Sequence, residues 1–366
     1  MNYLHLYIFL ASILFSCKQT DSLEPQSSET LVIYMAADND LKGNALLNVY
    51  DMVEGIKEDQ KVIVFMDKGD KSSYLMELNK KNGTAIHRQV VKQYPDQNSA
   101  DSHTLHQVLK EVIERYPSQQ YGLILWSHGT SWFPAPKPKT KSFGVDKQST
   151  MEIHDLATAL PTKFKYILFD ACLMGSVEVA SELQNTSDYL IASPTDILTT
   201  GMPYQKILPV LLNTQLTIED RLKEVCKTYI DHYKQKEGRM QSASIALYNL
   251  NHIPMVQLVM QKVISSRPNT KVKATNVQKF HKEADCYDLM DMIDKNYGTK
   301  AANQMQTALS SFILFHDHTE YFQETLSLKN SHGINCYIPV DPNTFYLEFY
   351  SNLQWSKTTQ YHKAIF

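Results

Sequence analysis

The chain has 366 residues, 43% of them hydrophobic and 20% charged, which is enough to bury one large core or two moderate ones. Its 36 Lys and Arg residues nearly balance 39 Asp and Glu residues, and no basic block forms a footprint for nucleic acid, so nucleic acid is not an expected partner. With only 12 Gly and 14 Pro, the composition excludes collagen-like and glycine-rich phosphate-binding chains and is typical of a globular enzyme or binding domain.

The N-terminus carries an export pattern. The apolar run from Leu4 to Phe15 is shorter than the roughly twenty residues that a membrane span needs, which is typical of a signal peptide. It ends in Ser16-Cys17, which resembles the lipobox of bacterial lipoproteins. We therefore expect a signal peptide at 1–16, a lipid on Cys17 that anchors the protein to a membrane of the cell envelope or surface, and a polar tether at 17–29. A plain secretory signal is the alternative, and both export the protein.

From residue 31 onward, short β-rich apolar runs alternate with amphipathic segments, as in a parallel sheet that is covered on both faces. The expected strands are 31–36, 61–66, 74–78, 122–127, 166–169 and 189–192. The expected helices are 41–56, 102–116, 153–160 and 176–183, where apolar residues recur at helical spacing. The sequence therefore predicts an α/β fold.

Beyond Gly201 the pattern becomes mostly helical. The expected helices are 217–236, 253–265, 284–297 and 300–315, and strand-like runs occur at 243–250 and 333–339. Because the late strands could extend the first sheet, the boundary near residue 252 is a soft one. We expect an α/β domain at 30–251 and a mostly helical region at 252–366 packed on it.

The sequence offers no convincing metal site. Apart from Cys17, the cysteines are spread widely and form no CxxC pair, so at least some of them are expected to be buried free thiols. They are Cys172, Cys226, Cys286 and Cys336. His103 and His106 lie three apart on a predicted helix without a third ligand. The acids at 285, 288, 291 and 294 are best interpreted as one polar helix face.

Two predicted strands end in reactive side chains. One stops at Ser127-His128-Gly129 and the other at Asp170-Ala-Cys172, and the carboxyl ends of parallel strands meet at one edge of a sheet. Such a pair supports attack by a thiol on an acyl carbon, with His128 handling the protons. A helix starting just after Cys172 would favour the thiolate, and Gly129 would let an amide approach an oxyanion. The alternative is that Cys172 merely packs and His128 merely caps.

Three segments closely resemble the clostripain family of cysteine peptidases: Leu31-Val-Ile-Tyr-Met-Ala-Ala-Asp-Asn-Asp-Leu41, Leu123-Ile-Leu-Trp-Ser-His-Gly129 and Phe169-Asp-Ala-Cys-Leu-Met-Gly-Ser-Val-Glu-Val-Ala180. The resemblance extends, more weakly, to residues near 340. It implies a caspase-like α/β/α sandwich with a mainly parallel sheet, as in gingipains and legumains. It also implies a catalytic dyad of His128 and Cys172 and cleavage after Arg or Lys.

A preference for Arg or Lys needs a carboxylate in the pocket for the residue before the scissile bond. Asp170 matches the family residue that contributes to this pocket, and Asp196 could supply a second acid; a structural carboxylate is the alternative for Asp170. The chain departs from the family at Ile197 to Tyr204, where many members carry an acidic, glycine-rich stretch. Ser127 also replaces the Asp or Asn that several relatives place before the histidine.

The resemblance further suggests activation by self-cleavage between the histidine and the cysteine. Lys139, Lys141 and Lys147 are candidate sites in the loop at 133–149, whereas a proline follows Lys137. No cofactor is required by the residues themselves, and calcium is suggested by the resemblance alone.

The sequence thus predicts an exported endopeptidase whose partners are polypeptide substrates. Within that interpretation, maturation of other exported proteins and digestion remain equally open. The alternative from another class is a catalytically silent surface protein that keeps the same fold and binds glycans or peptides.

Overall fold

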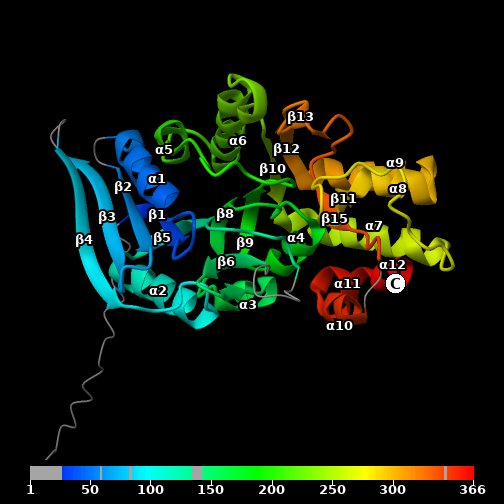
Figure 1. Ribbon diagram of the computed structural model, residues 1–366, viewed down its shortest axis with the longest axis horizontal. Coiled ribbons are helices and arrows are strands. Elements are labelled where there is room, and N and C mark those ends of the chain that lie inside the picture. Colours follow the sequence, from blue (N-terminus) through cyan, green and yellow to red (C-terminus); the bar gives the residue numbers. More distant parts are fainter. Residues whose placement is uncertain (1–26, 58–59, 82–84, 134–141, 342–343) are drawn as a thin grey trace, which may run out of the picture.

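The computed structural model describes residues 27–57, 60–81, 85–133, 142–341 and 344–366. Within these residues the centre is a nine-stranded sheet in the order β12-β10-β9-β8-β5-β1-β2-β3-β4 (Figure 1). In chain order its strands are β1 (Ser27–Ala36), β2 (Lys61–Asp67), β3 (Ser72–Lys81), β4 (Ala85–Pro95), β5 (Ser118–Trp126), β8 (Phe164–Asp170), β9 (Ser187–Ala192), β10 (Ser244–Asn249) and β12 (Ile313–His318).

The middle of the sheet is parallel and its edges are antiparallel. Strands β2, β1, β5, β8 and β9 pair in parallel, whereas β3 and β4 on one side and β10 and β12 on the other pair antiparallel. The parallel strands are apolar runs buried on both faces, such as residues 31–36 of β1. The sequence prediction of an α/β sandwich with a mainly parallel central sheet is confirmed.

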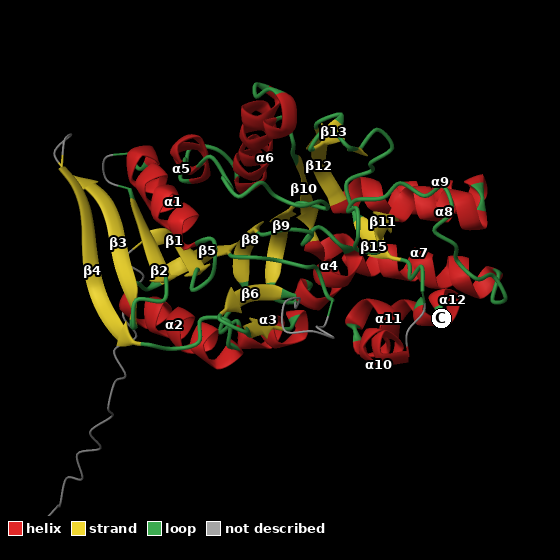
Figure 2. Ribbon diagram, viewed as in Figure 1, coloured by secondary structure: helices red, strands yellow, loops and turns green. Residues whose placement is uncertain are grey.

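Helices cover both faces of this sheet (Figure 2). One face packs against α1 (Lys42–Gly55), α5 (Tyr204–Leu211) and α6 (Ile218–Lys234). The other packs against α2 (Ser102–Arg115), α3 (Ile153–Ala159), α4 (Val177–Leu183) and α7 (Ile253–Ser266). Side-chain oxygens cap the N-termini of several of these helices. In α2, the Asp101 carboxylate accepts hydrogen bonds from the amides of His103 and Thr104.

Short elements complete the described chain. A hairpin of β6 (Phe143–Asp146) and β7 (Ser149–Met151) precedes α3, and the turns η1 (Gly238–Met240) and η2 (Leu250–His252) flank β10. The C-terminal region holds β11 (Cys286–Asp288), α8 (Leu289–Tyr297), α9 (Thr299–Phe312), β13 (Tyr321–Phe322), β14 (Leu326–Ser327), β15 (Asn335–Tyr337), α10 (Thr344–Asn352), α11 (Gln354–Thr359) and α12 (His362–Ile365). Among the described helices, none combines the length and the apolar character needed to cross a membrane.

Five sequence expectations differ from the structure. Strand β4 was not predicted, because an edge strand needs only one pairing partner and polar residues interrupt its apolar ones without strict alternation. The helix expected at 284–297 starts only at Leu289, and the one at 300–315 gives way to strand β12 at Ile313. The run at 333–339 forms β15, which pairs with β11 rather than with the central sheet. Strand β1 includes residues 27–29, which the sequence assigns to the tether.

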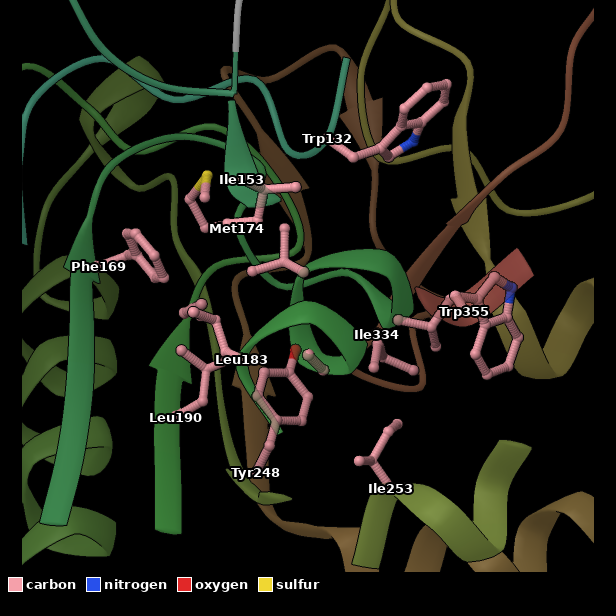
Figure 3. Close-up of a cluster of buried hydrophobic side chains, with 14 of the residues drawn as sticks. Trp132, Ile153, Phe169, Met174, Leu183, Leu190, Tyr248, Ile253, Ile334 and Trp355 are labelled. Atoms are coloured by element: carbon pink, nitrogen blue, oxygen red, sulfur yellow. The ribbon is translucent and has the colours of Figure 1, made fainter. Parts of the chain in front are cut away.

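The C-terminal region shares the hydrophobic core of the sandwich. In Figure 3, side chains from the sheet, such as Phe169 and Leu190, and from the C-terminal region, such as Ile334 and Trp355, gather in one cluster. A buried carboxylate joins the two parts as well, because Glu178 of α4 accepts from the Tyr337 amide and the Tyr350 hydroxyl. This packing fixes α4 and the loop before it, which carries Cys172.

Candidate active site

His128 and Cys172 lie at neighbouring strand ends. Trp126 of β5 pairs in register with Asp170 of β8, and each reactive side chain follows its strand by two residues. Both line one cavity of about 290 Å³. The cavity is lined by Leu41, Trp126, Ser127, His128, Asp170, Ala171, Cys172, Asp196, Ile197, Leu198, Thr199, Gly201, Phe322 and Gln323. The structure therefore brings together the two residues that the sequence pairs as nucleophile and base.

The Cys172 thiol is held by the backbone of one residue. Its Sγ accepts from the Ile197 amide at 3.3 Å and lies 3.6 Å from the Ile197 carbonyl oxygen, to which the thiol donates. Burial, followed by the charge of Asp196, raises the pKa of Cys172 to about 12. At neutral pH the resting group is thus a thiol.

The helix expected at 176–183 forms, but it does not begin directly after Cys172. Helix α4 starts at Val177 with Ser176 as its cap, and the intervening loop contains Leu173 in the left-handed region at φ 63°. The helix N-terminus therefore does not support the sulfur, and the expectation of a thiolate stabilised in this way is wrong. The loop's own hydrogen bonds, such as Leu173 N–H to Thr195 O, use its amides for packing instead.

His128 is paired with a residue that sequence reasoning passed over. Its Nε2 lies 2.7 Å from Oδ1 of Asp40, in the turn after β1, and this hydrogen bond lowers the pKa of Asp40. Asn39 shapes that turn, because its amide donates to Ala36 O and Val145 O. The usable signal was topological: β1 neighbours β5 in parallel, so the residues after β1 lie beside those after β5.

A glycine is required at position 129 because the backbone of Cys172 passes close to it. A Cβ at this position would lie 2.6 Å from the Cys172 carbonyl oxygen, so a larger residue would displace the loop that carries Cys172. Within the described chain, the amides of Gly129 and Cys172 have no hydrogen-bond acceptor. Ser127, which replaces an acid or amide of several relatives, donates to Ala36 O and accepts from the Val145 amide, so it ties the strand end to its neighbours.

Asp170 lies at the base of the cavity, 5% exposed. Its Oδ2 accepts from the Met202 amide at 3.1 Å and the Tyr204 hydroxyl at 2.9 Å. Gly201, at φ 67°, passes so close that a Cβ would lie 2.7 Å from the same oxygen. Burial raises the pKa of Asp170 to about 6. Oδ1 accepts no hydrogen bond from the described residues, so it is available to a cationic ligand.

Asp196 also lines this cavity, on the loop after β9. His281 lies behind it, with Nε2 3.4 Å from Asp196 Oδ2. A second hollow of about 230 Å³ adjoins the first and shares Asp196, Phe322 and Gln323 with it. His281 was not a sequence candidate, because 85 residues separate it from Asp196 and only the packing of the 278–284 loop brings the two together.

The other candidates lie apart from the cavity or outside the described residues. Cys17, Lys139 and Lys141 belong to the latter group. Lys147 lies at the tip of the β6–β7 hairpin at φ 55°, with its ammonium beside Asp38 and Asp96. His103 and His106 bond to Gln107 and to Ala159 O, respectively.

The acidic face of α8 is used within the fold. Asp288 caps α8 and pairs with His332, and Asp291 accepts from the Gln278 amide. Asp285 accepts from the Val340 amide. Among the described residues, no three His, Cys, Asp or Glu side chains group as metal ligands. The arrangement at the cavity supports thiol chemistry beside a buried carboxylate.

Known proteins resemble the chain over most of its length. The family model of the clostripain family, peptidase family C11, matches residues 33–365. Clostripain from Hathewaya histolytica is 26% identical over 221 residues, which are 49% of this chain and 41% of clostripain, so the chain spans less than half of that relative in this match.

Two solved structures match more completely. A secreted C11 cysteine protease from Bacteroides thetaiotaomicron, in complex with an irreversible peptide inhibitor, superposes with a TM-score of 0.81 at 25% identity, covering 92% of this chain and 99% of that one. An inactive zymogen C11 protease from Parabacteroides distasonis gives 0.79 at 26% identity, covering 91% and 98%.

Proposed function

The chain belongs to the clostripain family of cysteine peptidases, and from this premise we propose that it is an endopeptidase that cleaves polypeptides after Arg or Lys. The observation that carries the proposal is the single cavity in which His128, Cys172 and the buried Asp170 meet. A nucleophile, a proton-transfer group and a counter-charge for a basic side chain are the three parts that such a reaction needs.

In this mechanism the Cys172 thiol gives its proton to His128 as the sulfur attacks the carbonyl carbon of the scissile bond, and the amides of Gly129 and Cys172 donate to the resulting oxyanion. The C–N bond then breaks as His128 gives a proton to the leaving amine. Water, deprotonated by His128, hydrolyses the thioester and restores the thiol. Asp40 orients the imidazole through its hydrogen bond to Nε2. Thiol chemistry of this kind needs no cofactor, and calcium remains suggested by the family resemblance alone.

Asp170 gives the proposed specificity its physical basis. Oδ2 is held by Met202 and Tyr204, which leaves Oδ1 to pair with a guanidinium or ammonium group in the cavity. Asp196 adds a second negative charge to the same space. Since Ile197 to Tyr204 lacks further acids, these two carboxylates carry the preference for a basic side chain.

The specificity should depend on pH through Asp170. Because the pKa of this buried carboxyl is raised to about 6, acidification through that value protonates it and removes its charge. We expect the ratio of kcat/KM for an Arg peptide over its citrulline analogue to fall as the pH drops below about 6, up to tenfold per pH unit. Citrulline is neutral and nearly isosteric, so the ratio cancels every effect of pH that the two peptides share. A flat ratio between neutral and weakly acidic pH would contradict the assignment.

Self-processing in the loop at 133–149 is a further part of the proposal. Lys139 and Lys141 are the better candidates, because proteases bind their substrates in extended form and Lys147 sits in a tight turn with two acidic neighbours. One structural relative carries the description of an inactive zymogen, which supports a regulated form in this fold.

We assign the protein to the cell envelope or surface. The support is the pattern of residues 4–17 and the description of the Bacteroides relative as secreted. A lipid on Cys17 would tether the catalytic domain to a membrane, and the remaining partners would be polypeptide substrates.

The first test is hydrolysis of matched fluorogenic peptides that differ only in Arg, Lys, citrulline or Leu before the scissile bond. With protein from residue 27 onward, we expect turnover of the Arg and Lys peptides to exceed that of the neutral ones by about 10²-fold or more, the range for a charge pair in a desolvated pocket. A gel of the same samples should show a break between residues 133 and 149. No turnover of any peptide, with the chain intact, would favour the silent binding protein; turnover with equal rates would leave a peptidase without basic preference.

A further inference from the structure

The cavity around the nucleophile is acidic and contains no built-in cation. Asp170 and Asp196 both line it together with Cys172, and its lining within the described chain includes neither Lys nor Arg. His128, at the rim, directs its Nε2 to Asp40. Two carboxylates beside a thiol oppose the formation of a third negative charge, since like charges in a partly dry site repel strongly.

The environment of Cys172 is consistent with a restrained thiol. Ile197 holds the sulfur from both its amide and its carbonyl, and the carbonyl can accept a hydrogen bond only while the proton is still on the sulfur. Asp196, the preceding residue, lies beside the thiol and adds to its electrostatic penalty. The Ile197 amide favours the thiolate, but burial, the Ile197 carbonyl and the carboxylates outweigh it, so the neutral thiol is the favoured form.

His281 does not cancel the charge of Asp196. Its Nδ1 accepts from the amides of Glu283 at 3.0 Å and Ala284 at 2.7 Å, so this nitrogen carries no proton. The imidazole is then neutral, with its proton on Nε2 and directed to Asp196 at 3.4 Å. The 281–284 loop thus places a neutral imidazole beside Asp196, whose burial raises the pKa of its carboxyl while His281 and the hydrogen bond with Cys172 lower it.

From these contacts we propose that the substrate itself activates the nucleophile: a guanidinium or ammonium side chain, on entering the cavity between Asp170 and Asp196, supplies the positive charge that allows Cys172 to ionise. The S–H electron pair stays on sulfur and the proton passes to His128, which later donates it to the leaving amine. Asp196 is a positioning residue here, since it acts through the ionisation of Cys172. This inference rests on the proposed function, and it places the basic preference in the chemical step as well as in binding.

The test measures the thiol without using peptide cleavage. Iodoacetamide, a small neutral reagent, alkylates the thiolate, and mass spectrometry of the Cys172 peptide gives its rate at neutral pH. Saturating butylguanidinium, which carries the reactive end of an Arg side chain, should accelerate alkylation about tenfold, the effect of one pKa unit. Butylurea, its neutral analogue, should not. An unchanged or slower rate with butylguanidinium, or equal acceleration by butylurea, would overturn the proposal.

Two variants separate the carboxylates. Asp196→Asn should raise the rate of alkylation without any cation about tenfold, because it removes the neighbouring charge and keeps the side-chain volume. Asp170→Asn should lower the acceleration by butylguanidinium severalfold, since the cation loses its partner. Circular dichroism and thermal unfolding establish that both variants are folded. If folded Asp196→Asn reacts no faster than the parent protein, Asp196 does not restrain the thiol and the proposal fails.

The outcome is independent of the proposed peptidase activity. Acceleration by butylguanidinium without cleavage of any peptide would support the activation of Cys172 and contradict the endopeptidase. If the protein cleaves Arg peptides but butylguanidinium leaves the rate of Cys172 alkylation unchanged, the endopeptidase is supported and the activation of Cys172 by the substrate is contradicted.

Discussion

Replacement of Cys172 by Ala is expected to lower kcat/KM for the Arg peptide by roughly 10⁴-fold or more, in line with the loss of a catalytic nucleophile in other peptidases. Alanine removes the sulfur that attacks the carbonyl but leaves the amides of residues 129 and 172 in place. The fold should persist, because Sγ contacts only the Ile197 backbone and no helix depends on it. Initial rates and far-UV circular dichroism of both proteins provide the measurement.

Cys226→Ala provides the matched control. Cys226 is a free, fully buried cysteine on α6, where it packs against the face of the sheet opposite to α4. Its removal costs stability through a small cavity but takes no group from the active site. We expect its kcat/KM to stay within about twofold of the parent value, as for core changes remote from a site. Cleavage by the Cys172→Ala variant at the rate of the parent protein would rule out Cys172 as the nucleophile.

The sequence predicted the parts of the site that depend on single strands. A buried apolar strand that ends in a reactive side chain can be recognised from the local sequence, and the parallel arrangement then places neighbouring strand ends together. This explains why His128 and Cys172, which the sequence pairs, line one cavity. The alternation of strands and amphipathic helices likewise predicted the layered architecture, including the helices on both faces. These features follow from periodicity and topology, which short segments encode.

What the sequence did not predict depends on loops and on distant packing. Asp40 reaches His128 because Asn39 bonds to Val145, more than a hundred residues away, and no local pattern signals that contact. His281 reaches Asp196 through a loop whose own amides fix its tautomer. Helix α4 begins at Val177, within one residue of the predicted start, but the loop that separates it from Cys172, with Leu173 at positive φ, has no local signal in the sequence. The electrostatics of Cys172 are set by these same loops.

Asp170→Asn is expected to separate binding of the basic side chain from the rest of the chemistry. The amide oxygen can still accept from the Met202 amide and the Tyr204 hydroxyl, so the pocket keeps its shape, but the charge is lost. We expect kcat/KM for Arg and Lys peptides to fall by about 10²- to 10³-fold, as for one partner of a desolvated charge pair. The citrulline peptide should be affected far less. Asp188→Asn, at the start of β9 beside Lys163 and Lys165, is the control.

The Asp170→Asn substitution should raise the free energy of unfolding above pH 6, although it lowers activity toward Arg and Lys peptides. The folded pKa of Asp170, about 6, lies above the usual value of 3.8, so the native state binds the proton more tightly than the unfolded chain does. Ionised Asp170 therefore costs stability above pH 6, by about 3 kcal/mol from the pKa difference, and this cost disappears as the pH falls toward 4. Asn carries no such cost. Denaturant unfolding should find Asp170→Asn more stable than the parent above pH 6, with the advantage shrinking in acid.

Higher stability together with lost cleavage after Arg would identify Asp170 as a carboxylate retained for function at the expense of folding. A structural carboxylate gives the opposite pattern, because a charge that the fold uses is stabilising and its removal lowers the free energy of unfolding at neutral pH. The two interpretations that the sequence left open for Asp170 therefore differ in the sign of one measured quantity. If Asp170→Asn lowers the free energy of unfolding and reduces cleavage of all peptides, basic and neutral, by the same factor, the structural role is favoured.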